Sequence, residues 1–121
     1  MIEVIDVEGA NVIGVRVQGK IQKDEMLKAL DTVKDALDDM ETVNIYAEVD
    51  EFEGFEVQAF LHDMRVALPN ALRFRKEAVV TNQESLKKWI YFSNLIWLGG
   101  QAKVFSTDNR DAAIEWVQHP A

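Results

Sequence analysis

The stretch Val43-Asn44-Ile45-Tyr46-Ala47-Glu48-Val49 decides the fold class of this chain, because its β-branched and aromatic residues are typical of a strand. Before it, the apolar residues between Asp24 and Met40 recur every three to four positions, which predicts an amphipathic helix. The β-branched run from Val12 to Val17 precedes that helix and predicts another strand. A strand, a helix and a strand in this order predict two parallel strands joined by a right-handed crossover.

The elements expected on either side of this unit complete a sheet covered by helices. Toward the N-terminus, a strand over 2–7 and the turn-forming Glu8-Gly9-Ala10-Asn11 predict a hairpin with the next strand. Toward the C-terminus, we expect a helix over 55–68, a strand over 74–80, a helix over 84–98, a strand over 102–105 and a last helix over 112–117, capped by Asp108 and Asp111. We therefore predict one domain over 1–121, an α/β sandwich whose mixed, mostly parallel sheet has an N-terminal antiparallel hairpin and about four helices.

Composition excludes several classes of function. The 121 residues include 13 Lys and Arg against 21 Asp and Glu, a net charge of −8, which argues against binding to nucleic acid or to anionic membranes. The chain has no cysteine, which excludes disulfides and cysteine-ligated metals. Neither a signal peptide nor a run long enough to span a bilayer is evident, so the cytoplasm is the expected compartment.

Chemistry in an open α/β sheet is expected beyond the carboxyl ends of the parallel strands. The first such end is the predicted loop Asp50–Gly54, whose carboxylates suit either a hard cation or the N-terminus of the following helix. His62 and His119 stand in no metal-ligand pattern, and no serine lies in a nucleophile elbow. We therefore expect no catalysis, no cofactor and no bound metal.

The predicted helix over 84–98 carries more apolar residues than one buried stripe requires. From Leu86 onward, its apolar side chains point nearly all the way round the helix at about 100° per residue. These residues are Trp89, Ile90, Tyr91, Phe92, Leu95, Ile96, Trp97 and Leu98. Three interpretations stay open: the last turn tucks under the sheet edge, a second copy of the chain covers it, or an apolar ligand or lipid does.

Four stretches of the chain carry a resemblance to a known family. They are Met1–Val17, Val15-Arg16-Val17-Gln18-Gly19-Lys20, Glu48-Val49-Asp50-Glu51-Phe52-Glu53-Gly54-Phe55 and Asp111-Ala112-Ala113-Ile114-Glu115-Trp116. Together they resemble the SpoIIAA-like family, small bacterial proteins with the STAS-type fold of anti-sigma-factor antagonists. The resemblance covers nearly the full chain. It implies a non-enzymatic module that binds a protein or a small ligand, with kinship to the lipid-binding CRAL-TRIO domains.

One position follows from the resemblance. Antagonists of this fold have a phosphorylatable serine at the start of the helix after the third strand, just before a small residue. The corresponding residue here is Glu53, before Gly54. A carboxylate has one fixed negative charge, whereas a phosphate brings about −1.5 to −2. The resemblance therefore implies a permanently charged site, or one that has lost its role, in place of a kinase-controlled switch.

The sequence thus predicts a non-catalytic STAS-like binding module of the bacterial cytoplasm that forms a homodimer and contacts a protein or a small apolar ligand. The alternative is a lipid or fatty-acid carrier with a pocket under the third helix. The expected contact residues are Phe52, Glu53, Gly54, Phe55, Phe60, Trp89, Phe92, Ile96 and Trp97.

Overall fold

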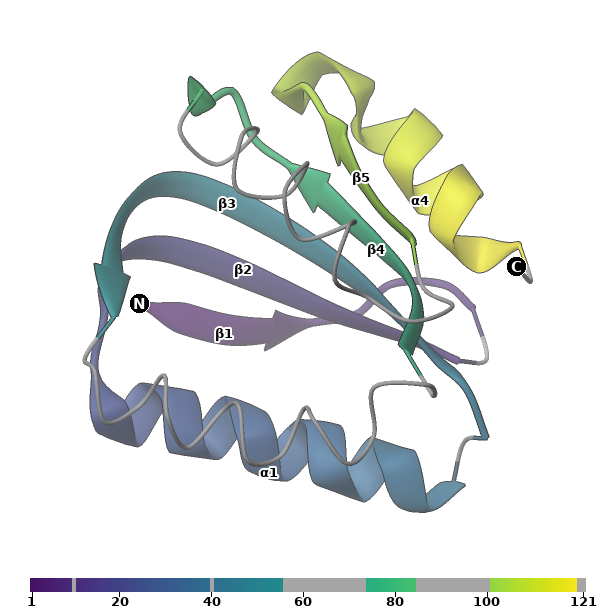
Figure 1. The fold of residues 1–121 in the computed structure, drawn as a ribbon, viewed down its shortest axis with the longest axis horizontal. Coiled ribbons are helices and arrows are strands. Elements are labelled where there is room, and N and C mark those ends of the chain that lie inside the picture. The colour runs from purple at the N-terminus through teal and green to yellow at the C-terminus, as the bar shows by residue number, and fades with distance from the viewer. Residues whose placement is uncertain (10, 40, 56–73, 85–100, 120–121) are drawn as a thin grey trace.

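A five-stranded sheet forms the centre of the protein in the computed structural model, which describes residues 1–9, 11–39, 41–55, 74–84 and 101–119 (Figure 1). Its strands are β1 (Ile2–Ile5), β2 (Val12–Ile21), β3 (Val43–Phe55), β4 (Phe74–Val80) and β5 (Gln101–Phe105). They lie side by side in chain order, with β1 antiparallel to β2 and every other pair parallel. The predicted mixed, mostly parallel sheet with an N-terminal antiparallel hairpin is therefore confirmed.

Two α-helices lie within the described residues, where the sequence predicted about four in the whole chain. They are α1 (Lys23–Asp39) and α4 (Arg110–Gln118), which follows the short 3₁₀ helix η2 (Thr107–Asn109). The bodies of the other two predicted helices lie outside the described residues. The predicted caps of the last helix were wrong: Asn109 is the N-cap, and no side-chain hydrogen bond caps that end. Asp108 and Asp111 instead place negative charge in the first turns of η2 and α4.

The two helices cover opposite faces of the sheet. Since successive side chains of a strand point to opposite sides, alternate residues of a strand face one helix or the other. On one face, Tyr46 and its neighbours pack against α4, which contacts β3, β4 and β5. On the other face, Ile45 packs near α1, which contacts β1 and β2. The buried cluster under α4 consists of Val12, Tyr46, Ala78, Val80, Ala113 and Val117. Figure 1 shows that α4 stands over the β3–β5 half of its face, whereas β1 and β2 lie farther from it.

Side chains of the sheet hold the C-terminal end of α4. The buried Asn44 donates its Nδ2 hydrogen bond to the Val117 carbonyl at 2.7 Å, and the Lys76 ammonium donates to the Trp116 carbonyl at 3.1 Å. The Lys76 ammonium also lies 5.0 Å from the centre of the Trp116 ring. Since the last carbonyls of a helix have no partner within it, these donors satisfy them and complement the helix dipole.

Strand β3 is longer than the sequence predicted. Asp50–Gly54 was expected to be a loop and Phe55 to begin a helix, but the strand continues to Phe55. The reason is pairing with β2, where Lys20 lies opposite Gly54 and Ile21 opposite Phe55. Backbone hydrogen bonds to a neighbouring strand can hold a polar, glycine-containing stretch whose side chains alone favour a turn.

A bulge lies where β3 passes beyond Gln18. Gln18 pairs with Asp50, and the next pair joins Lys20 to Gly54. Two residues within this irregularity have positive φ angles, Gly19 at 67° and Glu51 at 48°. Such bulges bend a strand and redirect its side chains. Strand β3 therefore leaves the regular ladder after Asp50 and rejoins it at Gly54, and Asp50, Glu51 and Glu53 along this stretch are exposed.

Candidate functional site

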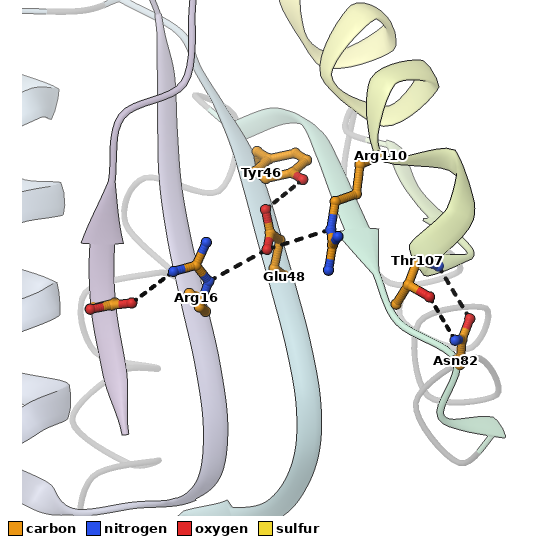
Figure 2. Close-up of polar contacts among 7 residues, drawn as sticks. Arg16, Tyr46, Glu48, Asn82, Thr107 and Arg110 are labelled. Atoms are coloured by element: carbon orange, nitrogen blue, oxygen red, sulfur yellow. Dashed lines mark hydrogen bonds and ion pairs between the residues drawn. The ribbon is translucent and has the colours of Figure 1, made fainter.

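Four charged side chains form a continuous row across the face of the sheet beside α4 (Figure 2). Arg16 lies 3.0 Å from Glu3 and 3.5 Å from Glu48, measured between nitrogen and oxygen. Glu48 in turn lies 3.7 Å from Arg110. We name Glu3, Arg16, Glu48 and Arg110 the charge row. Its members come from β1, β2, β3 and the first residue of α4, so the row joins four separate elements.

Strand register places the first three members of the charge row together. Arg16 is the cross-strand partner of Glu3 in the antiparallel β1–β2 pair and of Glu48 in the parallel β2–β3 pair. Directly opposite residues point to the same face, so the three side chains meet. Arg110 reaches Glu48 because α4 begins just above β3. The charge row was not predicted from the sequence, although aligning Val12–Val17 with Val43–Val49 as parallel strands would have brought Arg16 near Glu48.

Glu48 is the centre of the row. Its Oε1 atom accepts from Arg16 and lies near Arg110, while its Oε2 atom accepts a 2.9 Å hydrogen bond from the Tyr46 hydroxyl. Tyr46 is buried, and this burial, followed by the hydrogen bond to Glu48, raises the pKa of the phenol well above its ordinary value. The hydrogen bond that Arg16 donates to Glu3 and, next, the charge of Glu48 raise the pKa of Arg16. The carboxylate thus has donors on both oxygens, an arrangement suited to fixing charges in place.

A second polar group lies where β4 and β5 end. The Asn82 side chain donates to the Thr107 hydroxyl at 2.7 Å and accepts from the Thr107 backbone N–H at 3.2 Å (Figure 2). The hydroxyl of the buried Thr81 accepts from the Gln83 N–H at 3.1 Å, and the Thr81 backbone N–H donates to the Phe105 carbonyl at 2.9 Å. These bonds fasten the start of η2 to the end of β4 and thereby position Arg110 for the charge row.

The predicted contact residues divide into two groups. Phe52, Glu53, Gly54 and Phe55 belong to β3 and not to a loop. Glu53 is exposed, and its Oε2 atom lies 3.7 Å from the position that a Cβ atom on Gly19 would occupy. The remaining predicted residues, Phe60, Trp89, Phe92, Ile96 and Trp97, lie outside the described residues.

The acidic residues of the described part do not gather as metal ligands. Among residues 1–9, 11–39, 41–55, 74–84 and 101–119, no group of three acidic or histidine side chains could hold a metal ion. Asp50, Glu51 and Glu53 are instead exposed along the end of β3. No described helix is long and apolar enough to cross a membrane.

Comparison with known proteins first defines the class of fold. The structure is similar to that of an uncharacterized protein of the DUF3478 family with a SpoIIAA-like fold from Shewanella loihica PV-4, with a TM-score of 0.79 and 17% identity over 97% of this chain and 92% of that one. It is also similar to the anti-sigma factor antagonist SpoIIAA in its unphosphorylated form, with a TM-score of 0.60 and 11% identity over 95% and 98% of the two chains. The fold is therefore SpoIIAA-like.

The family follows from the sequence. The SpoIIAA-like family model matches residues 12–118, and the chain belongs to that family. A search of curated proteins gave no match.

Proposed function

We propose that this chain is a non-catalytic binding module of the bacterial cytoplasm that recognises a protein partner through the end of β3. One observation carries the proposal: β3 extends past the end of its pairing with β4. Its last pair with β4 joins Glu48 to Val80, whereas its pairing with β2 continues to Phe55. On its β4 side, the segment 49–55 therefore pairs with no described strand.

The charge of this segment indicates the kind of partner. Asp50, Glu51 and Glu53 are exposed on it, in a chain with a net charge of −8. Exposed charges of one sign speed the encounter with a partner of the opposite sign and exclude partners of the same sign. A partner that presents basic side chains fits this surface.

The similar SpoIIAA structure supports partner binding, since that protein is an anti-sigma factor antagonist. The family resemblance matched its phosphorylatable serine to Glu53. Glu53 lies within β3, just before Gly54, and its side chain is exposed. We propose that Glu53 supplies a permanent negative charge to the partner surface, so that binding needs no kinase.

The test is chemical cross-linking in the cells that produce the protein, followed by purification of the tagged chain. It compares the unaltered chain with Glu53→Lys. We expect a cross-linked partner whose contacts map to 49–55 and whose yield falls at least about tenfold in Glu53→Lys. The matched control is Asp31→Lys, the same charge change at an exposed position on α1. Equal loss in both variants, or contacts that map elsewhere, would contradict the proposal.

The apolar residues of 86–98 favour a second candidate, a carrier of a lipid or fatty acid. Native mass spectrometry of the gently purified protein distinguishes the two functions. A carrier retains an apolar molecule of fixed mass, and Trp97→Asp releases it without unfolding the chain. A ligand-free spectrum together with a cross-linked partner at β3 supports the protein-binding function instead.

A further inference from the structure

The charges of the charge row alternate in sign from the sheet edge toward α4. Glu3 is negative, Arg16 positive, Glu48 negative and Arg110 positive. The successive separations are similar, at 3.0, 3.5 and 3.7 Å. Half of each outer side chain is exposed, 47% for Glu3 and 55% for Arg110, so both ends of the row are accessible.

We propose that the charge row is the contact surface for a second copy of this chain. A row with this order of signs is complementary to itself when it is turned end to end. A two-fold axis between Arg16 and Glu48, perpendicular to the row, places Glu3 opposite the partner's Arg110 and Arg16 opposite the partner's Glu48. An axis along the row would place like charges together, so electrostatics selects one arrangement.

The position of α4 is compatible with the same arrangement. Helix α4 contacts β3, β4 and β5 and stands beside the row, over one half of the face (Figure 1). Turning the second copy end to end brings its α4 over the β1–β2 half of the first. The two α4 helices then lie on opposite halves of the interface, so they do not occupy the same space.

A second copy fits this surface better than a partner of one sign. An acidic or a basic ligand would meet as many like charges as opposite ones along the row. The chain itself carries the alternating order that is required. This inference does not depend on partner binding by β3, because the charge row and segment 49–55 are different surfaces.

The test uses charge reversal at the two ends of the row, read out by sedimentation velocity over micromolar to millimolar concentrations. We expect a dimer of the unaltered chain that weakens at least about tenfold in Glu3→Arg and in Arg110→Glu. Mixing these two variants restores association to within about threefold of the original, because each end then meets its opposite again. The double variant Glu3→Arg/Arg110→Glu associates with itself to the same extent.

Net charge cannot mimic this pattern. Glu3→Arg makes the net charge −6 and Arg110→Glu makes it −10, from −8. If general repulsion controlled association, Glu3→Arg would strengthen the dimer, whereas the charge row predicts that it weakens it. Lys28→Glu and Asp31→Arg, at exposed positions on α1, make the same charge changes away from the row and leave the dimer intact.

Three outcomes would overturn the proposal. They are a monomer at every concentration, a dimer that both row variants leave unchanged, and a failure of the mixed variants to associate. Thermal melting of each variant shows whether the monomer stays folded. Conservative Arg110→Lys, which keeps the charge, retains the dimer if charge is the cause.

Discussion

Tyr46 joins the apolar core to the charged face, because its ring is buried under α4 while its hydroxyl bonds to Glu48. Gly14 lies in the neighbouring strand, opposite Tyr46 in the β2–β3 register. Here the chain leaving β1 crosses close to the sheet, so no side chain fits. At Tyr46 the hydroxyl group, and at Gly14 the absence of a Cβ atom, allow the elements on this face of the sheet to pack closely.

Ionisation of Tyr46 is expected to occur only as the protein unfolds. Its pKa is raised above the ordinary 10.0, so the stability it contributes is fully present below pH 10 and is lost as the pH rises further. In Tyr91→Phe, Tyr46 is the one remaining tyrosine, and its ultraviolet absorbance should show phenolate only together with loss of structure. Tyr46→Phe should lose the alkaline dependence and, at neutral pH, about 1 kcal/mol for the hydrogen bond. Phenolate formation near pH 10 in the folded protein would refute this account.

Gly14→Ala should lower the free energy of unfolding by about 1–3 kcal/mol. A Cβ atom there would lie 2.5 Å from Val7 Cγ2 and 2.7 Å from the Ile5 carbonyl oxygen. Chemical denaturation measures the loss. Combining the change with Val7→Ala should recover only part of it, because the backbone oxygen of Ile5 stays in place. Full recovery would mean that the backbone contact is unimportant.

At the scale of elements, hydrophobic periodicity predicted the succession of strands along the chain and the position of α1 to within a residue. The apolar repeat in α1 and the β-branched runs of β2 and β3 are strong signals, since each depends on a whole segment. The end of β3 gave no such signal: its glycine and carboxylates favour a turn, and only pairing with β2 shows that it is a strand. The charge row was missed for a related reason, because Arg16 and Glu48 meet through a register between strands that a helix separates.

Asn44 should be the most sensitive polar residue of the sheet. Its amide donates to the Val117 carbonyl and accepts from the Lys76 backbone N–H at 3.1 Å, where the β3–β4 register shifts. Asn44→Ala leaves both groups without these bonds and should cost about 1–3 kcal/mol for each buried group. Asn11→Ala, which removes a 3.4 Å exposed hydrogen bond, is the matched control and should change stability by less than about 0.5 kcal/mol. Denaturant midpoints of the two variants test the difference, and equal midpoints would exclude a fastening role for Asn44.

The bulge in β3 should accept glycine at one position only. Glu51 has a φ of 48°, a region that costs a non-glycine residue about 1–2 kcal/mol. Glu51→Gly should therefore be neutral or stabilising, whereas Asp50→Gly, at a paired position opposite Gln18, should destabilise by about 0.5–1 kcal/mol. Thermal melting of the two variants compares them directly, and a larger loss in Glu51→Gly would contradict the strain.

At the scale of the whole molecule, the two helices are attached to opposite faces by different chemistry. Glu25 at the start of α1 accepts from the backbone N–H groups of Ile2 and Gln22 and lies 3.6 Å from the N-terminal amine. The other helix, α4, is held by donors from the neighbouring strands: the Asn44 amide and the Lys76 ammonium bond to its last carbonyls, and its own Gln118 donates to the Glu8 carbonyl at 3.0 Å. The first attachment centres on a carboxylate, Glu25, whose pKa is lowered by the backbone hydrogen bonds that it accepts.

Mild acid should therefore loosen β1 and α1 before α4. The hydrogen bonds from Gln22 and then Ile2 lower the pKa of Glu25, so its contribution to stability is present above its ordinary value of 4.5 and is lost as the pH falls through the lowered value. Hydrogen exchange of the β1 amides should accelerate in that range, while the amides of α4 keep their protection. In Glu25→Gln this pH dependence should disappear. Simultaneous loss of protection in both regions would show that the faces do not open separately.

The cluster beneath α4 takes residues from β2, β3, β4 and the helix that follows them all, from Val12 to Val117. While a ribosome is still making the chain, Tyr46 and Ala78 emerge long before the helix that shelters them. Until residues 110–118 leave the exit tunnel, α4 cannot cover these side chains. During that time they are accessible to chaperones. Contacts between such distant parts of a chain also slow its folding, so completion of the core depends on the last helix to be synthesised among the described elements.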